Sequence, residues 1–424
     1  MALPFSPAPG SRHDGLRSRA FRLLLLATVA SFSGYAMLLP LVPLWAVRGG
    51  AGEIGAGATT AVFMLTTVAM QLGMPWLLAR GGYRWTFVTG SLLLGLPTAL
   101  VGLSFDLVPL LVVAAVRGVG FGMVTVVGSA LAARLVPPGQ IGRAAGYYGM
   151  AVGAPLLVVL PAGVWLSLNV GFWVPFLAAT LAPLLGAVAA AAIRLDVRGD
   201  ADRAGRDGQR ADGRTVLRLW GTLAAPLVAM LVLAVASSAV VTFLAIPLAA
   251  APWVATAGLL GYSAAVLVGR WAAGLANDRG PGRSLLVAGA LGASSGMILL
   301  AWALWPAGQG WSGPGAVAVT LVIVGAVLFG AGFGGVQNET MVLMFRRSGP
   351  AEYGTASAAW NIGFDAGTGV GALGLGVVAQ TLGYGPAFAV AAVAATACLP
   401  VALSLARRTG RGGSAPSAAD GGAY

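Results

Sequence analysis

Lysine is missing from this sequence of 424 residues, and histidine and cysteine occur once each. Without Lys, a phosphate-binding loop of the form GxxxxGKS or GxxxxGKT is impossible, which excludes that route of ATP hydrolysis. The single histidine, His13, lies in a polar N-terminal tail, so a metal centre built from several His ligands is excluded. The single cysteine, Cys398, cannot form a disulfide within the chain. Most metal-dependent and His-dependent catalysis is therefore excluded.

Charged residues are scarce as well. They make up 9% of the chain, whereas apolar residues make up 58% and the mean hydropathy is +0.86. A typical soluble domain has about 25% charged residues, so this chain has too few to cover a water-exposed surface. Long apolar runs between short turns suit a bilayer, where each spanning helix satisfies its own backbone hydrogen bonds. The composition predicts an all-α integral membrane protein.

Twelve apolar runs are long enough to cross a bilayer as helices. The first run is about 25 residues long, which exceeds the apolar region of a signal peptide, so we expect it to remain as a spanning helix. The predicted spans are 23–47, 54–79, 85–104, 107–135, 143–168, 171–193, 219–248, 253–277, 284–305, 315–345, 353–381 and 384–406.

The positions of the 25 Arg residues provide an independent test of these spans. With twelve spans, 22 of them fall in the two tails and in loops on one side; only Arg48 falls on the other side, and Arg117 and Arg270 lie within spans. Basic residues concentrate in cytoplasmic loops, so both termini are predicted to be cytoplasmic. The use of Arg in place of Lys, with abundant Gly and Pro, is typical of a GC-rich bacterial genome. We therefore interpret the net charge of +12 as a genomic bias and expect no binding of nucleic acid.

A polar segment divides the chain between the sixth and seventh spans. It mixes seven Arg with five Asp residues and is predicted to be a disordered cytoplasmic linker. Two parallel six-helix repeats are one architecture of secondary transporters. The expected parts are a cytoplasmic N-terminal tail (1–22), a first six-helix bundle (23–193), the linker (194–218), a second six-helix bundle (219–406) and a disordered cytoplasmic tail (407–424).

Similar loops follow the second and the eighth predicted spans. The sequence GLANDRGPGR (274–283) follows the eighth span, and PWLLARGGYR (75–84) follows the second. The fourth span contains RGVGFG, and the fifth contains GMAVGAPLLVVLPAG. With these motifs, residues 20–406 resemble the major facilitator superfamily, whose loop signature is GxxxDRxGRR. The first copy departs from that signature at Pro75 and Ala79, and Ala114 stands where the family has an Arg in the fourth span, with Arg117 one turn later.

The resemblance implies twelve transmembrane helices in two pseudo-symmetric six-helix bundles. The Gly and Pro residues of the fifth span are similar to those of bacterial drug and metabolite efflux members. The resemblance also implies that Asp278 and Arg279 latch the two halves together in the outward-open state. Arg283, Arg80 and Arg84 belong to the same signature and are candidates for gating.

Four ionisable residues lie within the spans: Arg117, Arg270, Glu339 and Asp365. Such a group costs about 2.5–3.5 kcal/mol at the centre of a bilayer, which makes each a candidate for function. Asp365 lies about twelve residues into its span, ~18 Å along a hydrocarbon core ~30 Å thick, and Arg117 lies at a similar depth. We predict that Asp365 binds and releases the coupling proton, and that Arg117 holds an anionic substrate group or balances the charge of Asp365. The alternative for both is a structural role.

Arg270 and Glu339 lie closer to the cytoplasmic side. We expect them to pair with each other or with the loop signature, as a structural or gating pair. The candidate substrate contacts are polar or aromatic and lie in the spans, although membrane-interface or packing roles are the alternative. These candidates are Arg117, Asn361, Tyr35, Tyr147, Tyr262 and Trp360.

The sequence therefore favours a proton-coupled exporter of a small amphipathic compound in a bacterial plasma membrane. Its expected partners are the substrate, protons and the lipid bilayer; we expect a monomer with no cofactor and the proton gradient as energy source. The alternatives are an uptake symporter with the same fold and, more distantly, a polytopic membrane transferase. A channel is disfavoured because the sequence has no repeated filter-like loops.

Overall fold

The computed structural model describes residues 15–137, 140–193, 213–278, 285–306, 314–348 and 353–411. These residues form helices joined by short turns, and no strand occurs among them. Twelve helical segments in the described ranges are long and apolar enough to cross a membrane, which confirms the predicted number of spans. The predicted linker and the two tails lie largely outside the described residues.

The first half of the bundle consists of five long helices and two short ones. In chain order they are η1 (Gly15–Arg17), α1 (Arg19–Arg48), α2 (Gly52–Gly95), η2 (Leu96–Leu103), α3 (Leu107–Arg134), α4 (Ile141–Asn169) and α5 (Trp173–Ala191). The second half consists of α7 (Gly213–Ser238), the π-helical turn η4 (Ala239–Phe243), α8 (Pro252–Asp278), α9 (Leu286–Ala303), α10 (Ala316–Arg347), α11 (Tyr353–Leu382) and α12 (Tyr384–Arg411).

α2 provides two of the spans, Gly52–Met74 and Arg80–Leu103, the second completed by η2. Gly82 interrupts it with φ = 64° and ψ = 167°. This left-handed backbone conformation is available to Gly without the steric penalty that a Cβ atom imposes. The predicted loop between the second and third spans is therefore a single sharp break in an otherwise continuous helix.

Glycines allow corresponding helices of the two halves to pack closely. A Cβ atom at Gly118 of α3 would collide with the carbonyl oxygen of Phe63 on α2, and one at Gly330 of α10 would collide with that of Tyr262 on α8. Small residues at helix crossings are typical of membrane bundles because they let the backbones approach. A close glycine contact thus fixes the backbone of one aromatic residue in each half, Phe63 in the first and Tyr262 in the second.

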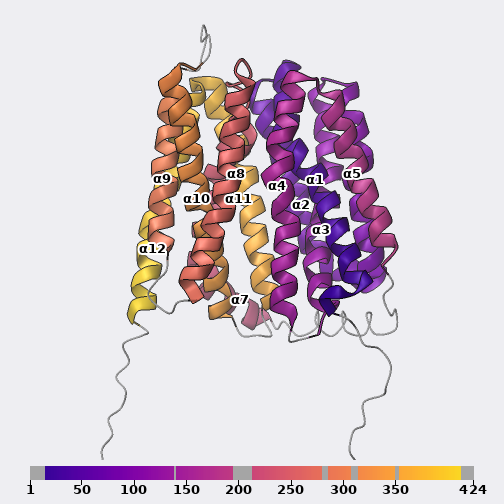
Figure 1. Cartoon of the computed structure of the whole chain (residues 1–424). Helices are drawn as coiled ribbons and strands as arrows, with labels where there is room; N and C mark the ends of the chain where they lie inside the picture. The colour runs from indigo at the N-terminus through magenta and orange to yellow at the C-terminus, as the bar shows by residue number, and fades with distance from the viewer. Residues whose placement is uncertain are drawn as a thin grey trace, which may run out of the picture.

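Among the residues that the structure describes, the two halves share a buried apolar core at only one end of the bundle. We call the end where α1 begins and α12 ends the terminal end, and the other the opposite end (Figure 1). One hydrophobic cluster lies wholly within the first half, whereas the other joins the second half to residues of the first. Those first-half residues, such as Leu41, Val101, Leu110 and Phe172, all lie toward the opposite end. The halves are therefore packed together at the opposite end.

Candidate substrate and coupling site

An aromatic cluster occupies the middle of the first half. Tyr35 of α1 is 5% exposed and stacks on Phe121 of α3, with ring centroids 4.0 Å apart. Phe63 of α2 contacts both rings, with its centroid 5.7 Å from that of Tyr35 and 5.5 Å from that of Phe121. The glycine crossing described above positions Phe63, so the cluster is built into the packing of α1, α2 and α3. We call Phe32, Tyr35, Phe63 and Phe121 the first aromatic cluster.

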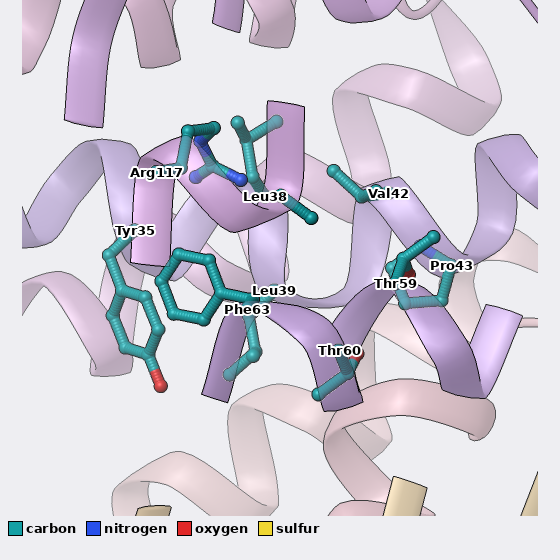
Figure 2. A pocket seen from close by; sticks show the side chains of 10 residues that line it. Tyr35, Leu38, Leu39, Val42, Pro43, Thr59, Thr60, Phe63 and Arg117 are labelled. Atoms are coloured by element: carbon teal, nitrogen blue, oxygen red, sulfur yellow. The ribbon is translucent and has the colours of Figure 1, made fainter. Parts of the chain in front are cut away.

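Arg117 lies beside this cluster and is 4% exposed. Its Nε donates a hydrogen bond to the carbonyl oxygen of Leu94 at 3.4 Å, and its guanidinium carbon lies 5.4 Å from the centre of the Phe63 ring. Arg117, Tyr35 and Phe63 border a cavity of about 20 Å³, and Figure 2 shows the Tyr35 hydroxyl pointing away from the guanidinium group. A cavity of that volume holds about one water molecule. In this conformation the guanidinium group is therefore bound within its own half.

Asp365 lies near the middle of α11 and is 3% exposed. Its Oδ2 accepts a hydrogen bond of 2.8 Å from Nε2 of Gln71, which belongs to α2 in the other half. Nε2 also lies 3.5 Å from the hydroxyl oxygen of Thr125 on α3. Tyr35 lies within electrostatic range of Asp365. No ion pair joins Arg117 to Asp365 in the described part of the chain, so the expected charge balance between them is not formed in this conformation.

A second aromatic cluster lies in the other half, where it consists of Tyr262, Phe329, Phe333, Trp360 and Phe364. The Tyr262 ring stacks on Phe329 at 5.9 Å, and its hydroxyl lies 2.9 Å from the hydroxyl oxygen of Ser237. Trp360 stacks on Phe364 at 6.0 Å, and its Nε1 donates a hydrogen bond to the Thr340 hydroxyl at 3.1 Å. Tyr262 and Asp365 both lie within electrostatic range of Tyr35 of the first aromatic cluster.

Two predicted substrate contacts do not join these clusters. The Nδ2 of Asn361 donates to the Ser357 carbonyl of its own helix at 2.8 Å. Tyr147 is 45% exposed, whereas its neighbour Tyr148 donates its hydroxyl to the Thr125 carbonyl at 3.4 Å and packs against Gly128. Adjacent residues on a helix point about 100° apart, so only one of two neighbouring tyrosines can face the interior.

The expected pair of Arg270 and Glu339 does not form, since no ion pair joins these two residues in the structure as described. Glu339 is 1% exposed, and its Oε1 accepts a hydrogen bond of 2.8 Å from the backbone N–H of Leu285, at the start of α9. A carboxylate at a helix N-terminus is stabilised by the unpaired N–H groups and the helix dipole. Arg270 is half-buried and lies within electrostatic range of Tyr262, two turns earlier on α8. Arg270 and Glu339 therefore do not pair with each other, because similar depth does not fix the direction of a side chain. The alternative, pairing with the loop signature, concerns residues outside the described part of the chain and stays a prediction.

The structure describes only part of the loop signature. The guanidinium carbon of Arg80 lies 4.1 Å from the centre of the Trp76 ring, and that of Arg84 lies 5.0 Å from the Trp85 ring. Asp278 is the last residue of α8. Its side chain, with Arg279 and Arg283, lies outside the described part of the structure, so the predicted latch stays a prediction.

Contacts of α2 with α11 and with the first residue of α12 run from the opposite end to Asp365, and we call them the α2–α11 seam. At the opposite end, the Tyr384 hydroxyl at the start of α12 donates to Oε1 of Glu53 at 2.8 Å. Next to it, Oε1 of Gln380 on α11 accepts from the backbone N–H of Ile54 at 3.0 Å. Ala51, the residue before α2, supplies no side-chain cap, so a residue of the other half caps this helix. These contacts are not predictable from the sequence, because each joins residues more than 300 positions apart.

Further along the seam, the helices touch through small residues. Gly57 of α2 lies against the carbonyl of Ala372. A Cβ atom at Gly369 of α11 would stand only 2.9 Å from Cβ of Met64. Toward the terminal end, in contrast, a Cβ atom at Gly73 of α2 would have no neighbour within 4 Å. The seam thus closes the opposite end and stops near Gln71 and Asp365.

Twelve membrane-length helices in two halves, with a buried carboxylate bonded across the interface, have the architecture of secondary transporters. The family model described as Major Facilitator Superfamily matches residues 24–312, and the chain belongs to this superfamily. Among curated proteins, none matches the chain significantly by sequence.

Solved structures of transporters share the fold. A bacterial homologue of the human lysosomal transporter Spinster, in an inward-facing and unoccupied conformation, is 14% identical with a TM-score of 0.70, over 96% of this chain and 100% of that one. The nucleoside transporter NupG is 10% identical with a TM-score of 0.69, over 91% of this chain and 99% of that one. A peptide transporter of the POT family, in complex with sulfate, is 15% identical with a TM-score of 0.69, over 92% and 95%. At such identities the similarity establishes the fold and leaves the substrate open.

Proposed function

We propose that the protein is a proton-coupled exporter of small amphipathic organic compounds that works by alternating access. The observation that carries the proposal is the position of Asp365, a buried carboxylate at the point where α11 of one half meets α2 of the other. An ionisable group inside a bilayer is expensive and marks proton or ion pathways. Asp365 binds a proton when accessible from one side and releases it to the other, so its charge changes with the conformation of the bundle.

The Arg distribution supports an orientation with both termini in the cytoplasm of a bacterial cell. The opposite end is then extracellular, and the structure, which is closed there, corresponds to an inward-facing state. To test the orientation, Ala204→Cys and Ala51→Cys are each introduced into a Cys398→Ala background. An impermeant maleimide added to intact cells is expected to label Ala51→Cys and not Ala204→Cys. The reverse pattern would overturn the orientation.

The aromatic clusters support a planar or amphipathic substrate. Tyr35 of the first half lies within electrostatic range of Asp365 and Tyr262 of the second, and pockets lined by aromatic side chains with a few placed polar groups are typical of organic ligands. Tyr35, Tyr262 and Trp360 are the proposed contacts. Arg117 is proposed to bind an acidic group of the substrate in a conformation in which its cavity is wider. The protein works as a monomer in the plasma membrane and needs no cofactor.

Asp278, Arg279 and Arg283 are proposed to close the terminal end when the opposite end opens, with Arg80, Arg84, Arg270 and Glu339 supporting the helix ends around them. This assignment follows the loop signature of the superfamily. The capping contact of Glu339 with Leu285 supports it, because it ties the end of α10 to the start of α9 next to that loop.

Inside-out membrane vesicles that contain the protein test the proposed transport directly. Vesicles are energised to an acidic interior, and a panel of aromatic and amphipathic compounds is added one by one. A transported compound is expected to accumulate inside and to release protons, seen as recovery of a quenched pH-sensitive dye; vesicles without the protein are the control. Proton movement together with substrate in the same direction would show uptake symport and refute export.

A further inference from the structure

Gln71 has a buried side-chain amide of which only the nitrogen has a hydrogen-bond partner in the described structure. It is 7% exposed; its Nε2 donates to Asp365, while its Oε1 is buried and has no hydrogen-bond partner in the described structure. An unsatisfied buried polar atom costs free energy and needs an explanation. Gln71 and Asp365 lie on α2 and α11, so the explanation concerns the contact between the two halves.

The two polar atoms of the amide, a donor and an acceptor, suit the two charge states of Asp365. An ionised carboxylate only accepts hydrogen bonds, and Nε2 supplies a donor. A protonated carboxyl group has an O–H to donate, and Oε1 is the acceptor that is presently unused. A rotation of the terminal amide of Gln71 by about 180° exchanges Nε2 and Oε1, so Gln71 can bond Asp365 in both states.

We propose that Gln71 is the positioning residue that transmits the charge of Asp365 to the other half of the molecule. The inference rests on the proposed function, in which Asp365 carries the coupling proton. A hydrogen bond to an ionised group is roughly twice as strong as one between neutral groups. Protonation of Asp365 therefore weakens the last contact of the α2–α11 seam and favours opening of the opposite end.

The other ionisable groups around Asp365 do not replace this contact. Tyr35 of α1 lies within electrostatic range, and no ionisable group on the helices packed against α11 hydrogen-bonds to Asp365 within the described residues. The span of α7 contains no ionisable side chain. The spans of α2, α10 and α12 that pack against α11 contribute Glu53, Glu339, Arg346, Arg347, Tyr384 and Cys398.

The experiment measures opening of the opposite end as a function of pH. Spin labels are attached at Ala51→Cys and Leu382→Cys in a Cys398→Ala background, and their distances are recorded by pulsed electron resonance in lipid nanodiscs. Lowering the pH from roughly 9 to roughly 5, across the range of carboxyl titration, is expected to raise the ratio of open to closed molecules about fivefold.

Three variants separate this inference from the proposed function. Gln71→Met keeps the volume and removes the amide; it is expected to abolish the pH response. Gln337→Met is the matched control, because Gln337 is 6% exposed with a buried, unpartnered Oε1 but does not bond Asp365; its pH response is expected to equal that of the wild type. Gln71→Glu places a second carboxyl group beside Asp365. It is expected to move the midpoint of opening to higher pH, because two neighbouring carboxylates resist ionising together.

A Gln71→Met protein that keeps the full pH response overturns the inference. If Asp365→Asn abolishes the response in the same experiment, the proposed proton site stands and only the role of Gln71 falls. If Asp365→Asn also keeps the response, the proposed proton site itself is refuted. Should Gln71→Met fail to fold, Gln71→Glu decides alone, and an unshifted midpoint overturns the inference.

Discussion

The two buried charges near the middle of the bundle are held in opposite ways. Arg117 is bound entirely within its own half, by the Leu94 carbonyl and the Phe63 ring. Asp365 reaches across the interface and is held by Gln71 of the other half. A group bound within one half moves with it and leaves the balance between conformations unchanged. A group bound across the interface changes that balance whenever its own charge changes.

The largest effect is expected from Asp365→Asn. The amide keeps the shape of the side chain but does not titrate, so gradient-driven accumulation in inside-out vesicles is expected to be lost completely. Exchange of substrate without a gradient is expected to persist, because alternating access itself needs no proton. Uphill transport with normal pH dependence in this variant would show that the charge across the interface is not the coupling group.

Arg117→Leu tests the charge that is held within one half. The Leu94 carbonyl also accepts a hydrogen bond from Thr98 at 3.0 Å, so the substitution leaves no unpaired acceptor. The proton-to-substrate ratio is expected to be unchanged. For substrates with an acidic group, KM is expected to rise about tenfold with the loss of a charged hydrogen bond. Equal effects on acidic and neutral substrates would remove Arg117 from the binding site.

A smaller effect is expected from Tyr384→Phe at the far end of the α2–α11 seam. It removes the bond to Glu53, which is partly exposed and contributes about 1 kcal/mol, so the ratio of open to closed molecules is expected to rise roughly fivefold. Spin labels at Ala51→Cys and Leu382→Cys measure this ratio. Thr381→Val is the control, because the Thr381 hydroxyl bonds only to carbonyls of its own helix. A response of the control equal to that of Tyr384→Phe would break the distinction between contacts within and across the halves.

Asp278→Asn is expected to have the smallest effect. The loop signature is predicted to latch the terminal end, which is open in the proposed inward-facing state, so loss of the charge is expected to favour that state slightly. Cysteine accessibility at the terminal end measures the change, with expression level as the control for folding. Unchanged accessibility would mean that the signature no longer acts as a latch in this chain.

The sequence alone predicted what depends on one segment at a time. The twelve spans were predicted from apolar runs. Arg117 and Asp365 were identified because an ionisable residue can be recognised within the apolar sequence of a single span. Contacts between distant segments were not predictable. The partner of Asp365, the capping role of Glu339 and the choice between Tyr147 and Tyr148 depend on helix rotation and on which helices are neighbours.

The cap on the first turn of α2 also has a consequence for synthesis. Gln380 follows Ile54 by 326 residues, and Asp365 follows Gln71 by 294. At about 5–20 residues per second, translation needs roughly 15–65 s to reach the partners of α2. During that time the first turn of α2 and the amide of Gln71 are already in the membrane without the groups that satisfy them. The early helices must therefore be held in place by their own packing, and α11 completes them only when it inserts near the end of synthesis.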